Sequence, residues 1–385
     1  MSKFIMILAI LVALISHADA GTLFKIAPYT LVHTNKNFLL NFQLNEDAEL
    51  SIEDGEKSFS PLKYLKNQQY QVELSPSLCG EEKEIRITRK TANALKSDVV
   101  FERKLPKADC PNAVSNYNDE FVFGFISDTQ EFEDRHHEVA KVIAHHHALE
   151  PIRFIVNGGD VVQTGDDENE WFKYFSGGSA YLLDIPQIAA IGNHDYRGNP
   201  RIAIPPLFKK YMRWDGAEQY GNLFYEFKKF NLIIFNSNLN ISLGQIEKTF
   251  WQWIEDKIIT SKNQNKPVII ATHFPAYSSS LNRFTAEGVI KIRSTLVPML
   301  EKYKVPLLLS GHTHMYERSF KNGVNYVVAG PAGGKPNKPS DKNPYKIAFD
   351  QNALTFTKIK ISNKLLFIET YNEENRLIDS TTINL

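Results

Sequence analysis

Residues 305–314, VPLLLSGHTH, carry the feature that decides the fold of this chain. A continuous apolar run ends at Ser310 and Gly311, and two histidines, His312 and His314, follow with one residue between them. A run that is short and apolar at every position is typical of a strand buried on both faces by helices. Side chains two apart in extended backbone point the same way, so a shared metal site is one reason for such a pair.

The same texture recurs from about residue 120 onward. Five further short apolar runs are FVFGFIS at 121–127, RFIVNG at 153–158, QIAAIG at 187–192, LIIFNS at 232–237 and PVIIAT at 267–272. Amphipathic stretches separate most of these runs, and helices are expected at 131–149, 245–261 and 285–303. β-like runs return from residue 353. The pattern predicts an α/β layered domain with extra antiparallel strands near its end.

Residues 22–104 have a different texture, with short β-prone runs broken by polar turns. The alternation of Phe38, Leu40, Phe42 and Leu44 predicts a strand with one buried face. A length of 385 residues favours two domains. We therefore expect a small all-β sandwich at 21–115 and a larger α/β domain at 116–385.

The first twenty residues predict a secretory signal peptide. Lys3 supplies a basic start, residues 4–15 an apolar core too short to span a bilayer comfortably, and 18–20 (ADA) a cleavage site. The mature protein is expected to be secreted or periplasmic, with no stable membrane association; an uncleaved anchor is the alternative. In an oxidising compartment Cys79 and Cys110 are expected to form a disulfide.

Composition excludes several classes of protein. Hydrophobic content of 43%, with 12% aromatic and 23% charged residues, argues against disordered and collagen-like chains. The charges balance at 44 Lys and Arg against 44 Asp and Glu. This balance, without a basic block, gives no electrostatic argument for nucleic acid or anionic membrane as the main partner. A small anionic substrate needs only a local cationic site and stays compatible.

Metal-capable side chains follow five of the six apolar runs. They are Asp128, Asp160, Asn193 with His194, His273, and His312 with His314. Strands of an open α/β sheet direct their carboxyl ends toward one crevice, so these side chains can converge. Alone, an aspartate after a strand is usually a helix cap and a histidine an ordinary core or surface residue. The whole set together predicts a metal site.

The chemistry of the donors points to two metal ions. Carboxylate, amide and imidazole groups suit Zn, Mn or Fe better than calcium or thiolate-seeking metals. Two such ions about 3.5–4 Å apart form a clamp for phosphoryl hydrolysis. A bridging carboxylate must hold them, and Asp160 is the candidate.

The order of these motifs resembles that of the calcineurin-like metallophosphoesterases. The residues that carry the resemblance are Asp128, GD at 159–160, GNHD at 192–195, His273 and GHTH at 311–314. HFPAYSS at 273–279, GHTHMYER at 311–318 and VVAGPAGG at 327–334 are similar to the purple acid phosphatase branch. The resemblance covers about residues 120–335. It implies an α/β/β/α catalytic domain, preceded by a small Ig- or fibronectin-like sandwich.

The resemblance also implies which side chains bind each ion. The first ion would be held by Asp128, Asp160 and His314, and the second by Asp160, Asn193, His273 and His312. The paired histidines then straddle the two ions, one for each. The small Gly311 would permit the turn between strand and histidines.

Two residues differ from the motif pattern of the proteins that this chain resembles. Gln130 stands where the wider superfamily often has a histidine, and Gln163 stands where purple acid phosphatases use a tyrosine. Without that phenolate the charge-transfer colour should be absent, and a ferric ion would lose a hard anionic ligand. We expect Gln130 to bind the first metal through its amide oxygen. The alternatives are a water in that place or a cap on the following helix. Gln163 is expected to contact ligands rather than metal.

The remaining polar residues suggest the chemistry. His194 resembles the histidine that faces the leaving group, with Asp195 fixing its tautomer and raising its pKa. The expected step is in-line attack by a metal-bound hydroxide, with His194 protonating the departing alkoxide. Arg197 and Arg283 are candidates for binding phosphate oxygens. Residues 316–318 are expected to support the histidine loop.

The sequence thus predicts an exported phosphatase that needs two metal ions and hydrolyses small phosphomonoesters. A phosphodiesterase or nucleotidase with the same site is the first alternative. A secreted binding protein with a vestigial phosphatase domain is the second. The histidines at 136, 137 and 145–147 are expected to be solvated on a helix surface rather than to form a third metal site.

Overall fold

The computed structural model describes residues 23–32, 38–46, 48–54, 57–59, 62–64, 68–74, 83–90, 98–105, 120–200, 204–212, 221–238, 247–362 and 364–385. The expected signal peptide, both cysteines and the expected boundary at 115 lie outside the described residues. Within the described part of the chain, no helix is long and apolar enough to cross a membrane.

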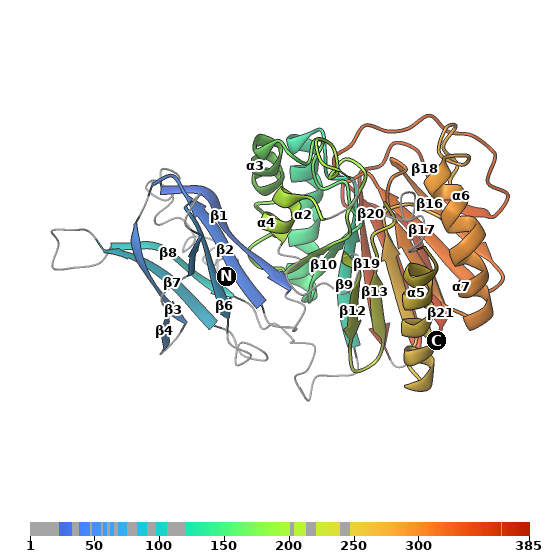
Figure 1. Ribbon diagram of the computed structural model, residues 1–385, viewed down its shortest axis with the longest axis horizontal. Coiled ribbons are helices and arrows are strands. Elements are labelled where there is room, and N and C mark those ends of the chain that lie inside the picture. The colour runs from blue at the N-terminus through green and yellow to red at the C-terminus, as the bar shows by residue number, and fades with distance from the viewer. Residues whose placement is uncertain are drawn as a thin grey trace, which may run out of the picture.

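Two mixed sheets face each other in the part of the chain after residue 120 (Figure 1). The first contains, in spatial order, β21 (Leu377–Asn384), β20 (Leu365–Asn372), β19 (Thr355–Ser362), β9 (Glu120–Ile126), β10 (Ile155–Asn157) and β11 (Gln187–Ala189). The second contains β12 (Leu223–Glu226), β13 (Asn231–Ile234), β14 (Val268–Thr272), β15 (Leu307–Ser310), β17 (Val324–Gly330), β16 (Met315–Lys321) and β18 (Lys346–Asp350). Strand β17 contacts β9 and β19, so the sheets pack against each other.

Helices cover the outer faces of both sheets. On the first sheet they are α2 (Glu133–Leu149), α3 (Glu168–Gly177) and α4 (Pro206–Met212). On the second they are α5 (Glu247–Asn263), α6 (Glu287–Lys291) and α7 (Val297–Tyr303), with a π-helical turn, η5 (Ile292–Leu296), between α6 and α7. Helix α2 packs on β19 and β20, and α5 packs on β13 and β14. The predicted α/β/β/α layering is confirmed.

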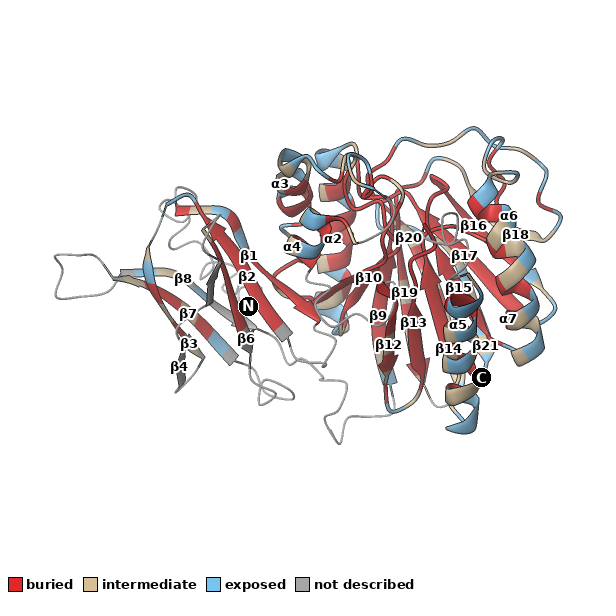
Figure 2. Ribbon diagram, viewed as in Figure 1, coloured by how far each residue is buried: buried red, intermediate tan, exposed pale blue. Residues whose placement is uncertain are grey.

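The continuous apolar runs are buried on both faces, as predicted. Every residue of β13, β14 and β15 is buried, because one sheet face meets the helices and the other meets the opposite sheet (Figure 2). On α5, Phe250, Trp251, Ile254 and Ile258 join the core on the helix side. The continuous apolar pattern of these runs therefore predicted their burial correctly.

The N-terminal part is built from strands, as predicted. They are β1 (Phe24–Val32), β2 (Phe38–Leu44), β3 (Glu49–Asp54), β4 (Lys57–Phe59), β5 (Leu62–Tyr64), β6 (Gln69–Leu74), β7 (Lys83–Lys90) and β8 (Asp98–Leu105). Strands β4, β3, β7 and β8 form one sheet, and β1, β2, β6 and β5 form a second group.

This second group is continuous with the first large sheet, which the sequence did not indicate. Strand β1 pairs in parallel with β11 through Leu31 and Gln187, giving a ten-stranded sheet. The expected single buried face of β2 is also wrong, because residues 39–44 are all buried. The polar Gln43 lies within hydrogen-bond reach of the Tyr211 hydroxyl of α4. Gln43 thus meets a residue of α4 on the side that was expected to face solvent.

Candidate metal and catalytic site

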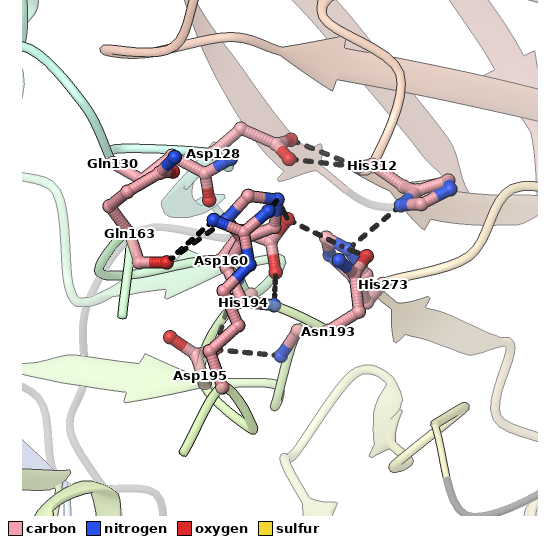
Figure 3. A network of polar contacts seen from close by, with 12 residues as sticks. Asp128, Gln130, Asp160, Gln163, Asn193, His194, Asp195, His273 and His312 are labelled. Atoms are coloured by element: carbon pink, nitrogen blue, oxygen red, sulfur yellow. Dashed lines mark hydrogen bonds and ion pairs between the residues drawn. The ribbon is translucent and has the colours of Figure 1, made fainter. Parts of the chain in front are cut away.

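The two sheets each supply half of the candidate site. From the first sheet, Asp128 follows β9, Asp160 follows β10 and Asn193 follows β11. From the second sheet, His273 follows β14, and His312 and His314 follow β15. These carboxyl ends meet where the sheets face each other, rather than along one sheet edge (Figure 3).

Two groups of side chains lie close enough to hold metal ions. Asp128, Asp160 and His314 form one group, and Asp160, His273 and His312 form the other, with the ligand atoms of each group within 4.8 Å of one another. Every member is buried. Asn193 adds an amide oxygen 3.1 Å from Nε2 of His273, beside the second group. Asp160 is common to both groups, which is the arrangement a bridging carboxylate requires.

Hydrogen bonds to carbonyls fix the tautomers of two histidines. Nδ1 of His273 donates to the carbonyl of Gly158 at 3.0 Å, and Nδ1 of His314 donates to the carbonyl of Lys335 at 2.7 Å. A carbonyl only accepts, so each ring carries a proton on Nδ1 and leaves Nε2, the nitrogen nearer the carboxylates, as the one that a metal would bind. This outer hydrogen bond is the usual partner of a metal-ligating histidine.

Backbone strain is concentrated at the same residues. Asp128, Asp160 and His312 have φ of 55°, 52° and 66°, in the left-handed region that residues other than glycine rarely occupy. Such strain of about 1–3 kcal/mol per residue persists only where the surroundings impose it, and it clusters at functional sites. The N–H of His312 donates to both carboxylate oxygens of Asp128, at 3.1 and 3.0 Å, which ties the two strained loops together.

The reason for Gly311 differs from the expected one. The positive φ belongs to His312, not to Gly311. A Cβ on Gly311 would instead lie 1.8 Å from Oγ of Ser127 and 2.6 Å from Oδ2 of Asp128. Gly192 has the same function on the other sheet, because its Cβ would lie 2.1 Å from Oδ1 of Asp160. Both glycines allow two backbones to approach around the carboxylates.

Mutual charge sets the protonation of the site when no ion is bound. Burial alone lowers the pKa of His273, but the adjacent Asp160 carboxylate outweighs burial and raises that pKa to about 9. Burial also opposes ionisation of Asp160, yet His273 holds the pKa of Asp160 below its usual range. Burial lowers the pKa of His312, and Asp128 raises the pKa of His314 against its burial. A cation would therefore replace protons in this cluster.

The residues present fit a pair of metal ions. Two buried carboxylates, three imidazoles and one amide form an oxygen and nitrogen donor set without thiolate, which suits borderline ions such as Zn, Mn or Fe. Buried charged groups without such ions would carry a large desolvation cost.

Residues 121–316, about half of the chain, match the sequence profile of the calcineurin-like phosphoesterases. The chain belongs to this family. Among its relatives, the probable purple acid phosphatase 20 of Arabidopsis thaliana is 24% identical over 196 residues, covering 46% of this chain and 45% of the relative. The Fe(3+)-Zn(2+) purple acid phosphatase 12 of the same plant is 26% identical, covering 52% and 43%. The chain thus spans less than half the length of these relatives.

The fold of this chain is similar to that of solved structures. A purple acid phosphatase from yellow lupin (Lupinus luteus) seeds has a TM-score of 0.72 at 17% identity, covering 93% of this chain and 74% of that one. A dimetal phosphatase from Danio rerio has a TM-score of 0.51 at 13% identity, covering 69% and 98%. The likeness to the lupin enzyme extends into the N-terminal strands, because it covers 93% of this chain. The predicted likeness to the purple acid phosphatase branch is confirmed.

Asp195 of the phosphoesterase motif GNHD does not contact the ring of His194, so the expected pairing is wrong. Its carboxylate instead accepts backbone N–H groups from Asp160, Val161, Val162 and Gly192, at 2.7–3.2 Å. These four donors come from the loop that carries the shared aspartate and from the turn before His194. Asp195 therefore shapes the bridging loop and does not set the tautomer of His194.

His194 has different partners from those expected. Its Nδ1 donates to the backbone carbonyl of Gln163 at 3.1 Å, and its Nε2 accepts from Nη2 of Arg197 at 2.9 Å. Burial lowers the pKa of His194, and the charge of Arg197 lowers it further, although Asp160 opposes both. The expected rise in this pKa is therefore wrong. Nε2 therefore carries no proton, and it lies 4.0 Å from Oδ2 of Asp160.

The two glutamines differ in burial: Gln130 is buried and Gln163 is partly exposed. Nε2 of the buried Gln130 lies 3.4 Å from Nε2 of His314, at the first group. The residue that caps α2 is Phe132, so the capping alternative for Gln130 is wrong. Gln163 contacts His194 through its backbone, and its buried Oε1 has no hydrogen-bond partner among the described residues. Whether either amide binds metal stays a prediction.

The two arginines are associated with different histidines of the site. The exposed Arg197 touches His194, whereas the positive charge of Arg283 lowers the pKa of His312 at the second group. Of residues 316–318, Glu317 supports a site loop, by accepting the N–H of Ser279 at 2.5 Å. Tyr316 and Arg318 bind Asp379 of β21, and their support of the histidine loop stays a prediction.

The helix histidines are not all solvated, contrary to expectation. His136 is fully buried, with Nε2 3.2 Å from the hydroxyl of Tyr181, and burial lowers its pKa to about 3. His146 is also buried, and its Nε2 contacts Oδ1 of Asn375 at 2.9 Å. These two rings are neutral core residues with polar partners.

Sequence reasoning missed a residue that holds His314. Asn337 accepts the N–H of His314 at 3.0 Å, and the N–H of Asn337 donates to the carbonyl of His314 at 3.0 Å. The segment around Asn337 carries no motif that would signal this contact. Its only cue is the glycine-rich stretch before it, which ends at Gly334 under the His314 ring.

Proposed function

We propose that the chain is a phosphatase that uses two metal ions to hydrolyse phosphomonoesters. The observation that carries the proposal is the position of Asp160, which belongs to both groups of candidate ligands. Asp128 and His314 would complete the first metal site, with Gln130 beside them. Asn193, His273 and His312 would complete the second.

When bound, the two ions would supply a hydroxide near neutral pH and neutralise charge on the phosphoryl group. Arg197 and Arg283 would bind phosphate oxygens, because guanidinium groups match that geometry. A phosphate oxygen that takes the guanidinium of Arg197 would release Nε2 of His194. The freed nitrogen could then hold the proton that the departing alkoxide needs, since Nδ1 stays bound to the Gln163 carbonyl.

The test combines metal analysis with hydrolysis of a chromogenic monoester and diester. We expect two ions per chain, and turnover of p-nitrophenyl phosphate faster than that of the bis ester. Asp160→Asn should lose metal and reduce kcat/KM by about 10³-fold or more, because both ions lose a ligand. Asp167→Asn is the matched control, since Asp167 only caps α3 through the N–H of Asn169. Hydrolysis that survives Asp160→Asn would refute the proposal.

The ratio of the two esters separates the alternatives. Faster diester turnover would make the chain a phosphodiesterase with the same ligands. A binding protein without activity has support in one relative, named a probable inactive purple acid phosphatase, which is 24% identical over 262 residues. Metal-loaded protein without turnover of either ester would favour that alternative.

We also propose that the protein is exported. The support is the pattern of residues 1–20, with its basic start, apolar core and small residues before the cleavage point. N-terminal sequencing of protein from the culture medium or periplasm should begin at Gly21. Retention in the cytoplasm with Met1 intact would contradict export. Non-reducing peptide mapping of the same material should recover Cys79 linked to Cys110.

A further inference from the structure

We infer that Arg293 is a positioning residue that sets the place of Arg283 at the metal site. The inference rests on the proposed function, because it concerns how the phosphate group is held. Arg293 lies in the π-helical turn η5, outside the site itself. Single π-helical turns inside α-helices occur frequently at functional sites.

The guanidinium of Arg293 closes a loop at both ends. Its Nε donates to the carbonyl of Ala276 at 2.9 Å, and its Nη2 donates to the carbonyl of Phe284 at 2.8 Å. The same group lies over the ring of Phe284, 3.9 Å from the centroid. One planar fork thus fixes the separation of residues 276 and 284, which a lysine with a single ammonium could not reproduce.

The closed loop follows His273, a member of the second group, and ends next to Arg283. Inside it, the N–H of Ser279 donates to the buried carboxylate of Glu317 at 2.5 Å, and Ser278 contacts Thr313 through their hydroxyls at 3.0 Å. The Arg293 guanidinium therefore binds two carbonyls of the loop, and the Glu317 carboxylate binds one of its N–H groups. Together they place the loop against the segment that follows β15.

Arg283 depends on this loop for its position. Its backbone N–H bonds the carbonyl of Ser280 at 3.3 Å, and its carbonyl accepts from Ala286 at 3.0 Å. Among the described residues, no hydrogen bond holds its guanidinium. The loop itself reaches the candidate ligands, because Ser278 contacts Thr313, the residue between His312 and His314. The place of the guanidinium is thus set by the backbone of the loop.

The loop is packed on one side and borders a pocket on the other. Ala276 and Tyr277 are buried in the core, whereas a surface pocket of about 460 Å³ is lined by Phe284 and Arg293 together with Tyr345 and Lys321. The polar bonds of Arg293 therefore hold the end of the loop that packing holds least. A misplacement of about 1 Å in a group that positions substrate can cost about 10²-fold in rate.

The test compares Arg293→Met and Arg293→Lys with Arg283→Met and the double variant. Inorganic phosphate is the probe, measured by calorimetry and as a competitive inhibitor. Arg293→Met and Arg283→Met should each weaken phosphate binding and raise KM by about tenfold, with kcat changed less than about threefold. The double variant should be no worse than either single variant, because both act through one group. Hydrogen exchange should rise within residues 276–284.

Lys302→Met is the matched control, because the Lys302 ammonium bonds Glu255 on the surface and not the loop. It should leave phosphate binding and exchange unchanged. Unchanged phosphate affinity in Arg293→Met, or effects that multiply in the double variant, would overturn the inference. If the methionine variant does not fold, Arg293→Lys replaces it. This variant keeps the charge but loses the planar fork, so it should also weaken phosphate binding, and unchanged binding would overturn the inference. If the wild type fails to hydrolyse esters, the proposed function fails, while calorimetry and exchange still test the link between the two arginines.

Discussion

At the scale of single residues, Asp160 brings together conditions that rarely occur at one position. It is buried, strained in φ, and shared by the two groups of candidate ligands. Its carboxylate is also paired with His273 at 3.2 Å when no ion is present. Without metal, this pair holds a proton more tightly in the folded than in the unfolded state. The stability of the metal-free protein should therefore depend on pH.

The metal-free protein should lose stability as pH rises from about 6.5 to 9. The pKa of His273 is raised from 6.5 to about 9 in the folded state, so the stabilisation is complete below 6.5 and is lost through 9. The slope should approach about 1.4 kcal/mol per pH unit for one proton. Urea unfolding of chelated protein at several pH values measures it. His273→Gln should reduce the slope and leave only the part due to His314, whose pKa is also raised; an unchanged slope would contradict the assignment.

Asp195→Asn should lower the free energy of unfolding by about 3 kcal/mol. The reason is that one carboxylate accepts four backbone N–H groups around the bridging loop, and an amide presents only one oxygen to them. Urea unfolding measures the change. The acid limb of the pH–rate profile should keep its position, because Asp195 does not bond His194. Unchanged stability with a shifted limb would restore the original interpretation of this residue.

At the scale of elements, a buried polar link joins the two sheets. Arg318 of β16 binds Asp379 of β21 with Nε and Nη2, at 2.6 and 3.0 Å, and Tyr316 donates to the same carboxylate at 2.6 Å. Their side chains are about nine-tenths buried, at 9% exposure for Arg318 and 10% for Asp379. This link connects the second sheet to the edge strand of the first.

Asp379→Asn should destabilise the fold by about 2–4 kcal/mol, because it leaves the Arg318 guanidinium buried without its counter-charge. Urea unfolding measures the change, and KM of the folded variant should stay the same, since the link lies outside the site. Asp341→Asn is the control: Asp341 is fully exposed and pairs with Lys346 at 3.6 Å, so its loss should change stability little. Equal effects of the two substitutions would show that burial of the Arg318 pair is unimportant.

At the scale of the whole molecule, the site lies at the junction of two sheets. Three candidate ligands come from the first sheet and three from the second, so bound ions would connect the two halves of the core. Ligands that bind only the folded state raise its stability with their concentration.

Removal of metal by a chelator should therefore lower Tm, and added ions should restore it. At an ion concentration 100 times Kd, the gain for one site is about 2.7 kcal/mol. Differential scanning calorimetry over a series of Zn and Mn concentrations measures the effect. The Tm of Asp160→Asn should respond weakly. A wild-type Tm that is independent of added ion would argue against metal binding in the folded state.

Much of the fold followed from local sequence. The runs that became β13, β14 and β15 were readable because burial on both faces requires apolar residues at every position. The side chains after each strand were readable because polar groups at successive strand ends are improbable without a shared site. The helix at 285–303 was only partly readable, since the π-helical turn at Ile292–Leu296 has no distinct periodicity over so few residues.

The sequence by itself determined the layered α/β class, the strand-rich N-terminal part, and which side chains gather at the strand ends, because these depend on short-range period and residue chemistry. Tertiary structure alone decided that the site joins two sheets and that β1 extends the first of them. It also decided that Asp195 holds the Asp160 loop, and that Arg293 holds the loop of Arg283. Each of these contacts joins groups far apart in the chain, and no local pattern records which distant partner a carboxylate or guanidinium will meet.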